Sequence, residues 1–274
     1  MNAAGIVLCG GLSSRMGRDK AWLPWRGQPL LGHVVDRLVS ILGEVLVVAA
    51  PDQLIPTVSA RIVRDRAPHL GPLAGIREGL DQMESPAAFI TGTDAPFLTP
   101  RFVQALVEAG PAAAPEIDGF VQTLAAVYPA EAAAVVEELL ATGKRRPLEL
   151  LERLDFVRIP AQALPDPDCV RGFNTPDQYL VAARKDQPGA MARVEFSGEG
   201  PREVPIGTLA EVLEAAAPGQ VAHPDGLLRD ELRVRVGDGM DVTDPGIPIG
   251  PGERVSVGEE MAPAHALPDG EPEG

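Results

Sequence analysis

Short apolar runs alternate with amphipathic segments along the first two thirds of the chain. Continuous apolar runs at 5–9, 45–49 and 87–92, with a shorter one at 61–64, predict strands buried inside a sheet. Leu30, Val34 and Leu38 recur at helical spacing, and further helices are predicted to follow Gly71 and Pro100. Strands and helices that alternate in this way indicate an α/β domain with a largely parallel sheet.

The pattern changes after residue 109. The Pro- and Ala-rich stretch 110–119 predicts a surface loop, and 119–128 alternates enough to predict one strand that covers the site. A helix is predicted over 130–141, ended by Gly143, and a short strand over 156–160. Residues 173–178 predict a turn that opens the last helix of this domain.

A polar linker with Pro and Gly at 184–189 predicts a domain boundary. We therefore expect a first domain over 1–185, a second over 191–260 and a disordered, acidic and Pro/Gly-rich tail over 261–274. The second domain shows strands at 193–196 and 202–206, a helix capped by Thr208, and strands at 232–236 and 254–257. This ββαββ order predicts a small α+β, ubiquitin-like (β-grasp) fold.

Composition and charge limit the classes of function and of partner that the chain is expected to have. Hydrophobic residues make up 45% of the chain, which is typical of a globular protein, and no apolar run approaches the ~20 residues of a membrane helix. The formal net charge of −15 disfavours nucleic-acid binding, so neither a nucleic acid nor a membrane is expected as partner. From Met191 onward there are 17 acidic and 6 basic residues, which indicates two units with different surfaces. Two cysteines and no signal-peptide pattern predict a cytoplasmic protein.

The first apolar run leads into a loop suited to phosphate. Gly10 and Gly11 let backbone N–H groups approach an anion, and Arg15 and Lys20 can neutralise its charge. The loop fits neither GxxxxGK[ST], because Ala21 follows Lys20, nor GxGxxG. A glycine pair after a strand often marks only a turn, but the Arg-Met-Gly and Asp-Lys that follow it at short range make a phosphate loop a more specific interpretation.

Polar residues also follow two later strands. Asp65 comes after the strand at 61–64, and Asp94 comes shortly after the strand at 87–92. Ligands bind at the carboxyl ends of the strands in such sheets, so the loop and both aspartates are expected at one edge. Each aspartate alone also fits a turn residue.

Four motifs of the first domain give it a resemblance to a known family. They are Leu8-Cys9-Gly10-Gly11 through Arg15-Met16-Gly17-Arg18-Asp19-Lys20, Gly71-Pro72-Leu73-Ala74-Gly75, Thr93-Asp94-Ala95-Pro96 and Asn174-Thr175-Pro176. With these, residues 4–183 resemble the nucleotidyltransferase family that includes molybdenum cofactor guanylyltransferase, which implies a Rossmann-like sheet. The resemblance implies transfer of GMP from GTP to the terminal phosphate of molybdenum-molybdopterin, with release of pyrophosphate. Close relatives that use CTP usually carry Ala-Gly in place of Gly10-Gly11, so this pair, together with Gly71-Pro72-Leu73-Ala74-Gly75, makes the chain resemble the branch of the family that uses GTP.

The resemblance also implies roles for single residues. Backbone groups of Leu8, Cys9 and Gly10 would hold guanine and ribose, with Gly11 and Gly71 also near the nucleotide. Lys20 would grip phosphate, Arg15 would neutralise the pyrophosphate, and Asp65 would contact the nucleotide. Asp94 would bind Mg²⁺, and Asn174 would line the site. The catalytic residues are then Arg15, Lys20 and Asp94.

The chain departs from the family pattern in two places. The family often carries an asparagine at the end of the second strand, where this chain has the apolar run 48–51, and a second asparagine near the position of Gly172. Three other features have simple explanations: Cys9 as a core residue rather than a nucleophile, Trp22 and Trp25 as packing residues, and the basic run 144–146 as a solvated helix end.

The second domain resembles the ubiquitin-like sulfur carriers of molybdopterin and thiamine synthesis, most visibly at 241–246 and 252–255. Such carriers end in Gly-Gly, whereas this chain ends Glu273-Gly274, so a carrier-like fold without carrier chemistry is expected. The domain would dock another protein of molybdenum cofactor biosynthesis or a molybdoenzyme chaperone. Two alternatives stay open for the whole chain: a related nucleotidyltransferase that uses CTP or another phosphorylated acceptor, and a non-catalytic nucleotide-binding scaffold.

Overall fold

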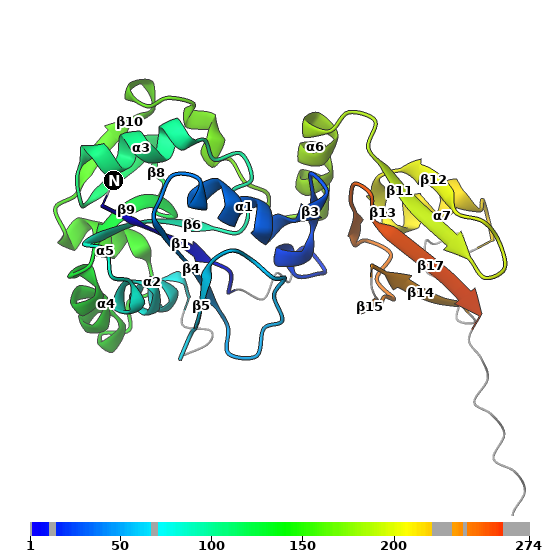
Figure 1. Ribbon diagram of the computed structural model, residues 1–274, viewed down its shortest axis with the longest axis horizontal. Helices are drawn as coiled ribbons and strands as arrows, with labels where there is room; N and C mark the ends of the chain where they lie inside the picture. Colours follow the sequence, from blue (N-terminus) through cyan, green and yellow to red (C-terminus); the bar gives the residue numbers. More distant parts are fainter. Residues whose placement is uncertain (1, 11–14, 67–70, 221–231, 238–239, 260–274) are drawn as a thin grey trace, which may run out of the picture. The chain divides into compact units, whose positions relative to one another are not determined.

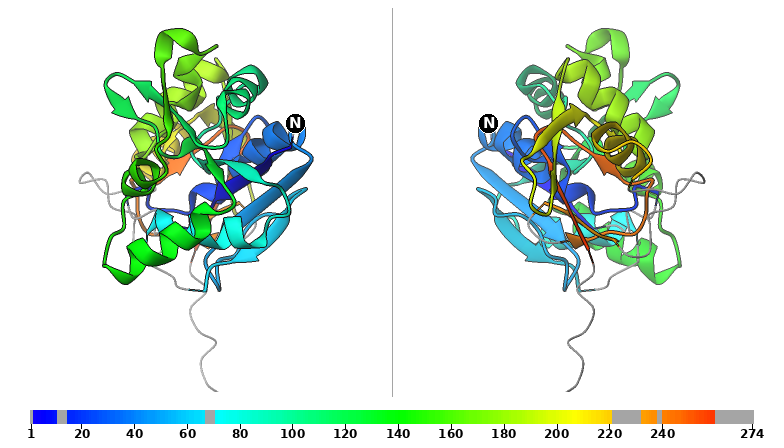
Figure 2. Two further views of the ribbon diagram at one scale, coloured as in Figure 1. Left: turned by 90° about the vertical axis from the view of Figure 1, so that its left-hand side faces the viewer. Right: turned by 90° about the vertical axis from the view of Figure 1, so that its right-hand side faces the viewer.

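This computed structural model describes residues 2–10, 15–66, 71–220, 232–237 and 240–259. The chain divides into two compact units, Met1–Ala182 and Ala183–Gly274. Figures 1 and 2 show the first unit in blue to green, with helices on both faces of its sheet. No helix among the described residues is long and apolar enough to cross a membrane. The predicted tail over 261–274 lies outside the described residues.

The first unit is built on an eight-stranded sheet with the order β10-β7-β9-β6-β1-β4-β5, and β8 pairs with β7 outside this path. β1 pairs in parallel with β4 and β6, β4 with β5, and β7 with β10, whereas β9 is antiparallel to both β6 and β7. The sheet is therefore mixed and largely parallel. Its strands are β1 (Ala4–Leu8), β4 (Glu44–Ala49), β5 (Arg61–Arg64), β6 (Ala87–Gly92), β7 (Ala113–Ile117), β8 (Phe120–Val121), β9 (Ala125–Pro129) and β10 (Val157–Pro160).

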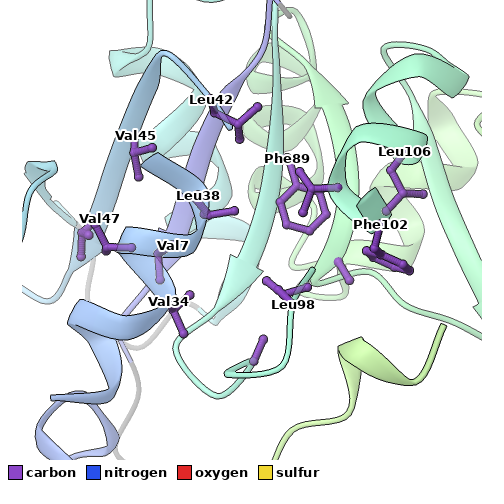
Figure 3. Close-up of a cluster of buried hydrophobic side chains, with 14 of the residues drawn as sticks. Val7, Val34, Leu38, Leu42, Val45, Val47, Phe89, Leu98, Phe102 and Leu106 are labelled. Atoms are coloured by element: carbon purple, nitrogen blue, oxygen red, sulfur yellow. The ribbon is translucent and has the colours of Figure 1, made fainter. Parts of the chain in front are cut away.

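Helices cover both faces because alternate residues of each buried strand point to opposite sides. Val7, Val47 and Phe89 face α1 and α3, as Figure 3 shows, whereas Ile6 and Ile90 face α2, α4 and α5. The core thus has two apolar layers, one on each side of the sheet. The helices are α1 (Leu30–Val39), α2 (Pro72–Gln82), α3 (Pro100–Ala109), α4 (Ala132–Ala141), α5 (Pro147–Arg153) and α6 (Pro176–Asp186), with short 3-10 turns η1 (Lys20–Trp22), η2 (Ala161–Ala163) and η3 (Pro167–Val170).

The predicted surface loop over 110–119 is wrong. It contains the buried strand β7, joined to β8 by a turn in which Asp118 and Gly119 have φ of 53° and 78°. Two positive φ values in a two-residue hairpin are typical of a type I′ turn, for which Asp-Gly is a favoured pair. The single strand predicted over 119–128 is likewise two strands, β8 and β9, with a break between them. Helix α5 has no counterpart among the helices that the sequence predicts.

Aromatic side chains pack the segment that follows Lys20 against the segment that precedes α6. The hairpin of β2 (Pro24–Trp25) and β3 (Gln28–Pro29) buries Trp25 completely, with ring centroids 5.7 Å from Phe173 and 5.4 Å from Phe97. The Tyr179 hydroxyl donates to the Pro24 carbonyl oxygen. Trp25 is therefore a packing residue, as predicted, and it joins the segment after Lys20 to the one before α6.

The second unit has a five-stranded sheet with the order β12-β11-β17-β14-β15, in which only β11 and β17 are parallel. α7 begins with a capping box between Thr208 and Glu211, so the predicted cap is confirmed. Its elements are β11 (Met191–Phe196), β12 (Arg202–Pro205), β13 (Gly207–Thr208), α7 (Leu209–Ala216), β14 (Leu232–Val236), β15 (Met240–Asp241), β16 (Pro248–Ile249) and β17 (Arg254–Glu259). The ubiquitin-like assignment stays a prediction.

Candidate active site

The site lies where the chain order reverses in the sheet. The chain runs from β1 outward through β4 to β5, and then returns to β6 on the other side of β1. Open α/β sheets bind ligands at such a switch point, outside the carboxyl ends of the strands. Residues that follow β1 and β6 therefore meet there.

Lys20 and Asp94 form the centre of this site. The Lys20 Nζ atom lies 2.9 Å from the Asp94 carboxylate, 2.9 Å from the Phe173 carbonyl oxygen and 2.8 Å from Asn174 Oδ1. Lys20 follows β1, Asp94 follows β6, and the other two residues lie just before α6. Three segments distant in sequence thus converge on one ammonium group, which uses all three of its donors.

Two glycines let the chain pass close to Asp94. A Cβ atom at Gly92 would lie 2.7 Å from Asp94 Oδ1, and one at Gly172 would overlap the Asp94 carbonyl oxygen. An asparagine at position 172 would therefore push Asp94 or its neighbours away. This contact gives a physical reason for one of the two departures from the family pattern.

Most of the described residues that are predicted to contact the nucleotide follow β1 or β5 or directly precede α2, on the β1–β4–β5 side of the switch point, whereas Asp94 follows β6. The Cys9 amide donates to the Val48 carbonyl oxygen, and the Leu8 carbonyl oxygen accepts from the Thr93 hydroxyl. Gly10 is exposed, and Gly11 lies outside the described residues.

Burial raises the pKa of the Cys9 thiol to about 12, with a smaller contribution from the Asp19 carboxylate. The thiol is therefore protonated at neutral pH and unsuited to nucleophilic attack, as predicted for a core residue.

Asp65 and Gly71 lie on either side of residues 67–70, which the structure does not describe. The Asp65 amide donates to the Ala49 carbonyl oxygen, which fixes its backbone at the end of β5. The neighbouring Arg66 pairs with the buried carboxylate of Glu78 on α2 at 2.8 Å. Gly71 has a φ of 80° and begins α2, a conformation that glycine adopts without strain.

Arg15 lies directly after the undescribed residues 11–14 and is exposed. Within the described part of the chain it makes no ion pair, so its side chain can turn toward an anion. The structure does not join it to the Lys20–Asp94 pair.

Gln53 is a residue of the site region that the sequence did not reveal. Its Nε2 atom donates to the Cys9 carbonyl oxygen at 3.2 Å and to Asp19 Oδ2 at 2.8 Å, while its Oε1 atom accepts from the Ala50 amide. It therefore fastens both ends of the phosphate loop to the end of β4. An amide side chain is thus present at this strand end, shortly beyond the apolar run in which the family pattern places asparagine.

Gln53→Ala is expected to raise the KM for the nucleotide by up to about thirtyfold, because the two lost hydrogen bonds to the loop are each worth about 1 kcal/mol and the loop loses its anchor. Steady-state kinetics measure this effect. The matched control is Gln82→Ala, at an exposed position of α2. An unchanged KM in Gln53→Ala would show that the loop holds its shape without the clamp.

The donor set is compatible with Mg²⁺. Asp94 offers a carboxylate that is one-third exposed, and Asn174 offers an amide oxygen next to it. In the described ranges no group of three or more His, Cys, Asp and Glu side chains is placed to hold a metal. Mg²⁺ is commonly held by one or two carboxylates together with substrate phosphates and water, and this site fits that pattern.

The fold and the position of this site define an α/β nucleotidyltransferase. A crystal structure of molybdopterin-guanine dinucleotide biosynthesis protein A from Archaeoglobus fulgidus matches with a TM-score of 0.56 and 26% identity, over 65% of this chain and 96% of the other. Residues 5–157 match the model of the MobA-like NTP transferase domain. The chain belongs to this family.

Relatives from mycobacteria agree with this assignment. A protein of Mycobacterium avium (strain 104) named "Probable molybdenum cofactor guanylyltransferase" is 38% identical over 184 residues, 64% of this chain and 92% of that protein. A protein of the same name from Mycobacterium tuberculosis (strain H37Rv) is 38% identical over 167 residues, 57% of this chain and 82% of that protein. The family match ends at residue 157, before Phe173, Asn174 and the whole second unit.

Proposed function

We propose that the first unit transfers GMP from GTP to the terminal phosphate of molybdenum-molybdopterin, giving the guanine dinucleotide form of the cofactor and pyrophosphate. The observation that carries this proposal is the convergence of Lys20, Asp94 and Asn174 at the switch point of a MobA-like sheet. The names of the mycobacterial relatives and of the Archaeoglobus protein support the choice of substrates.

The reaction needs positioning and charge more than a protein nucleophile. An oxygen of the acceptor phosphate forms a bond to the α-phosphorus of GTP, and the bond from that phosphorus to the bridging oxygen breaks. The electron pair leaves with pyrophosphate. Lys20 would exchange its contact with the Phe173 carbonyl oxygen for a phosphate oxygen, and Arg15 would neutralise the leaving group.

Asp94 and Asn174 would hold Mg²⁺, which supplies Lewis-acid polarisation of phosphate oxygens. Lys20 contacts both of these side chains, so it keeps their oxygens directed to one point. The protein's contribution is this fixed arrangement of a cation and two oxygen donors at the edge of the sheet.

Choice of nucleotide is tested by pyrophosphate release with molybdenum-molybdopterin, Mg²⁺ and either GTP or CTP. We expect release with GTP and at least tenfold less with CTP, since the Gly10-Gly11 pair favours GTP. Pyrophosphate release with CTP and not with GTP would mean that the protein catalyses the same type of reaction with another nucleotide and gives another product. No release with either would favour the alternative of a non-catalytic nucleotide-binding scaffold.

For the second unit we propose the ubiquitin-like (β-grasp) fold and a docking role toward another protein of cofactor maturation or toward a molybdoenzyme chaperone. The order of its elements supports the fold: two strands, a capped helix and further strands, with β11 and β17 side by side in parallel.

A further inference from the structure

A pocket of about 300 Å³ opens on the side of Asp94 away from the predicted nucleotide residues. Those residues follow β1 and β5 or begin α2. The pocket is instead lined from the β6–β9–β7 half of the sheet and from the segment before α6. Asp94 and Asn174 belong to its lining, so they stand between the two halves. A reaction that joins two substrates at one phosphorus needs a second binding region next to this point.

The sheet directions explain how the pocket forms. β7 runs parallel to β6, so its carboxyl end and the Asp118-Gly119 turn lie at the same edge as Asp94. β9 runs the other way, so its first residue, Ala125, lies at this edge too. The β7–β8 hairpin therefore forms a wall of the pocket.

Arg171 is the cation among the residues that line this pocket; the other charged members are Asp94 and Asp118. Its Nε donates to Asp168 at 2.7 Å, and one terminal nitrogen donates to Asp118 at 3.2 Å. All three side chains are more than half exposed. Exposed ion pairs contribute little to stability, so the contact to Asp118 can be exchanged without much loss.

We propose that this pocket binds the phosphomonoester end of the acceptor, and that Arg171 exchanges Asp118 for the acceptor phosphate. The inference rests on the proposed function and names the residue that recognises the second substrate. A guanidinium binds phosphate through two parallel hydrogen bonds, which fixes the direction of the phosphate as well as its place. Asp168 holds the Nε edge of the guanidinium and keeps it facing the pocket.

The positions of Lys20 and Arg171 also assign a separate cation to the nucleotide phosphates and to the acceptor phosphate. Lys20 serves the nucleotide side of Asp94, and Arg171 serves the acceptor side. Gly172 connects Arg171 to the Phe173 and Asn174 contacts with Lys20, so both cations are set by one short segment, 171–174. The acceptor phosphate carries most of its charge at neutral pH, so it can attack without a protein base.

The test compares Arg171→Ala with the matched control Arg101→Ala in full-length protein. Arg101 is also exposed and pairs with an aspartate, Asp166 at 3.2 Å, but it does not line the pocket. We expect Arg171→Ala to raise the KM for molybdenum-molybdopterin at least tenfold and to change the KM for GTP less than twofold. Arg171→Lys should recover part of the loss, and Arg101→Ala should match the parent protein.

A second measurement separates this inference from the proposed function. Metal-free molybdopterin is titrated into the parent protein and into both alanine variants, and binding is followed by calorimetry. Weaker binding in Arg171→Ala alone supports the pocket even if no transfer occurs, in which case only the proposed reaction fails. Equal binding in all three proteins, or an equal rise of both KM values in Arg171→Ala, would overturn the inference.

Discussion

Replacing Asp94 by asparagine is expected to lower kcat for nucleotidyl transfer about 10²–10³-fold, the size of loss found when one preorganised charge contact is removed from an active site. The amide keeps the shape of the side chain and can still accept from Lys20, but it loses the negative charge that would hold Mg²⁺. The fold should be unaffected because this carboxylate is one-third exposed. Steady-state rates with GTP and molybdenum-molybdopterin measure the loss.

A double variant of Lys20 and Asp94 tests whether the two residues act as one unit. Lys20→Met should cost a similar factor, and the double variant should lose no more than about tenfold beyond either single one, because groups that act as a unit are not additive. Asp36→Asn, at an exposed position of α1, is the matched control. Full additivity in the double variant would mean that Lys20 and Asp94 act independently.

Gly172→Ala is expected to lower kcat about 10²-fold, since a shift of about 1 Å in a positioning segment has an effect of this size. The added Cβ cannot coexist with the Asp94 carbonyl oxygen, so segment 171–174 must move away. This movement separates the Phe173 carbonyl and the Asn174 amide from Lys20. Thermal unfolding of the variant shows how much of the effect is loss of stability, for which overpacking costs about 1–3 kcal/mol.

Gly43→Ala is the control for this substitution, because a Cβ atom there meets nothing within 4 Å. We expect its rate and its melting temperature to match those of the parent protein. Wild-type activity in Gly172→Ala would show that Asp94 and its neighbours tolerate displacement, and that the close approach is a packing detail.

The sequence predicts most of the sheet and the centre of the site for the same reason. Buried parallel strands are continuous apolar runs, and the polar residues that follow them must meet at one edge. The amino-acid pattern therefore places Lys20 and Asp94 at one edge, and the family resemblance adds Asn174. In the structure Lys20 contacts both Asp94 and Asn174. Their roles in binding nucleotide and metal stay predictions.

The features that the sequence does not predict depend on weak or long-range signals. β7 resembles a loop because its Ala and Pro residues are not typical of strands, although the Asp118-Gly119 pair is a hairpin signal. Gln53 lies in a polar stretch, and nothing nearby indicates that its amide reaches Cys9 and Asp19. The need for glycine at 172 comes from a contact with Asp94 that only tertiary structure reveals.

Because Trp25 stacks on Phe173, its fluorescence is expected to respond to ligand binding at the neighbouring Lys20. The chain has two tryptophans, and Trp22 is 41% exposed, whereas Trp25 is fully buried against the residue whose carbonyl oxygen holds Lys20. A ligand that draws Lys20 toward phosphate changes the support of Phe173, and with it the surroundings of the Trp25 indole. With Trp22 replaced by phenylalanine, we expect the intrinsic fluorescence of the first unit to change when phosphate binds at Lys20, so that binding is followed without any added label.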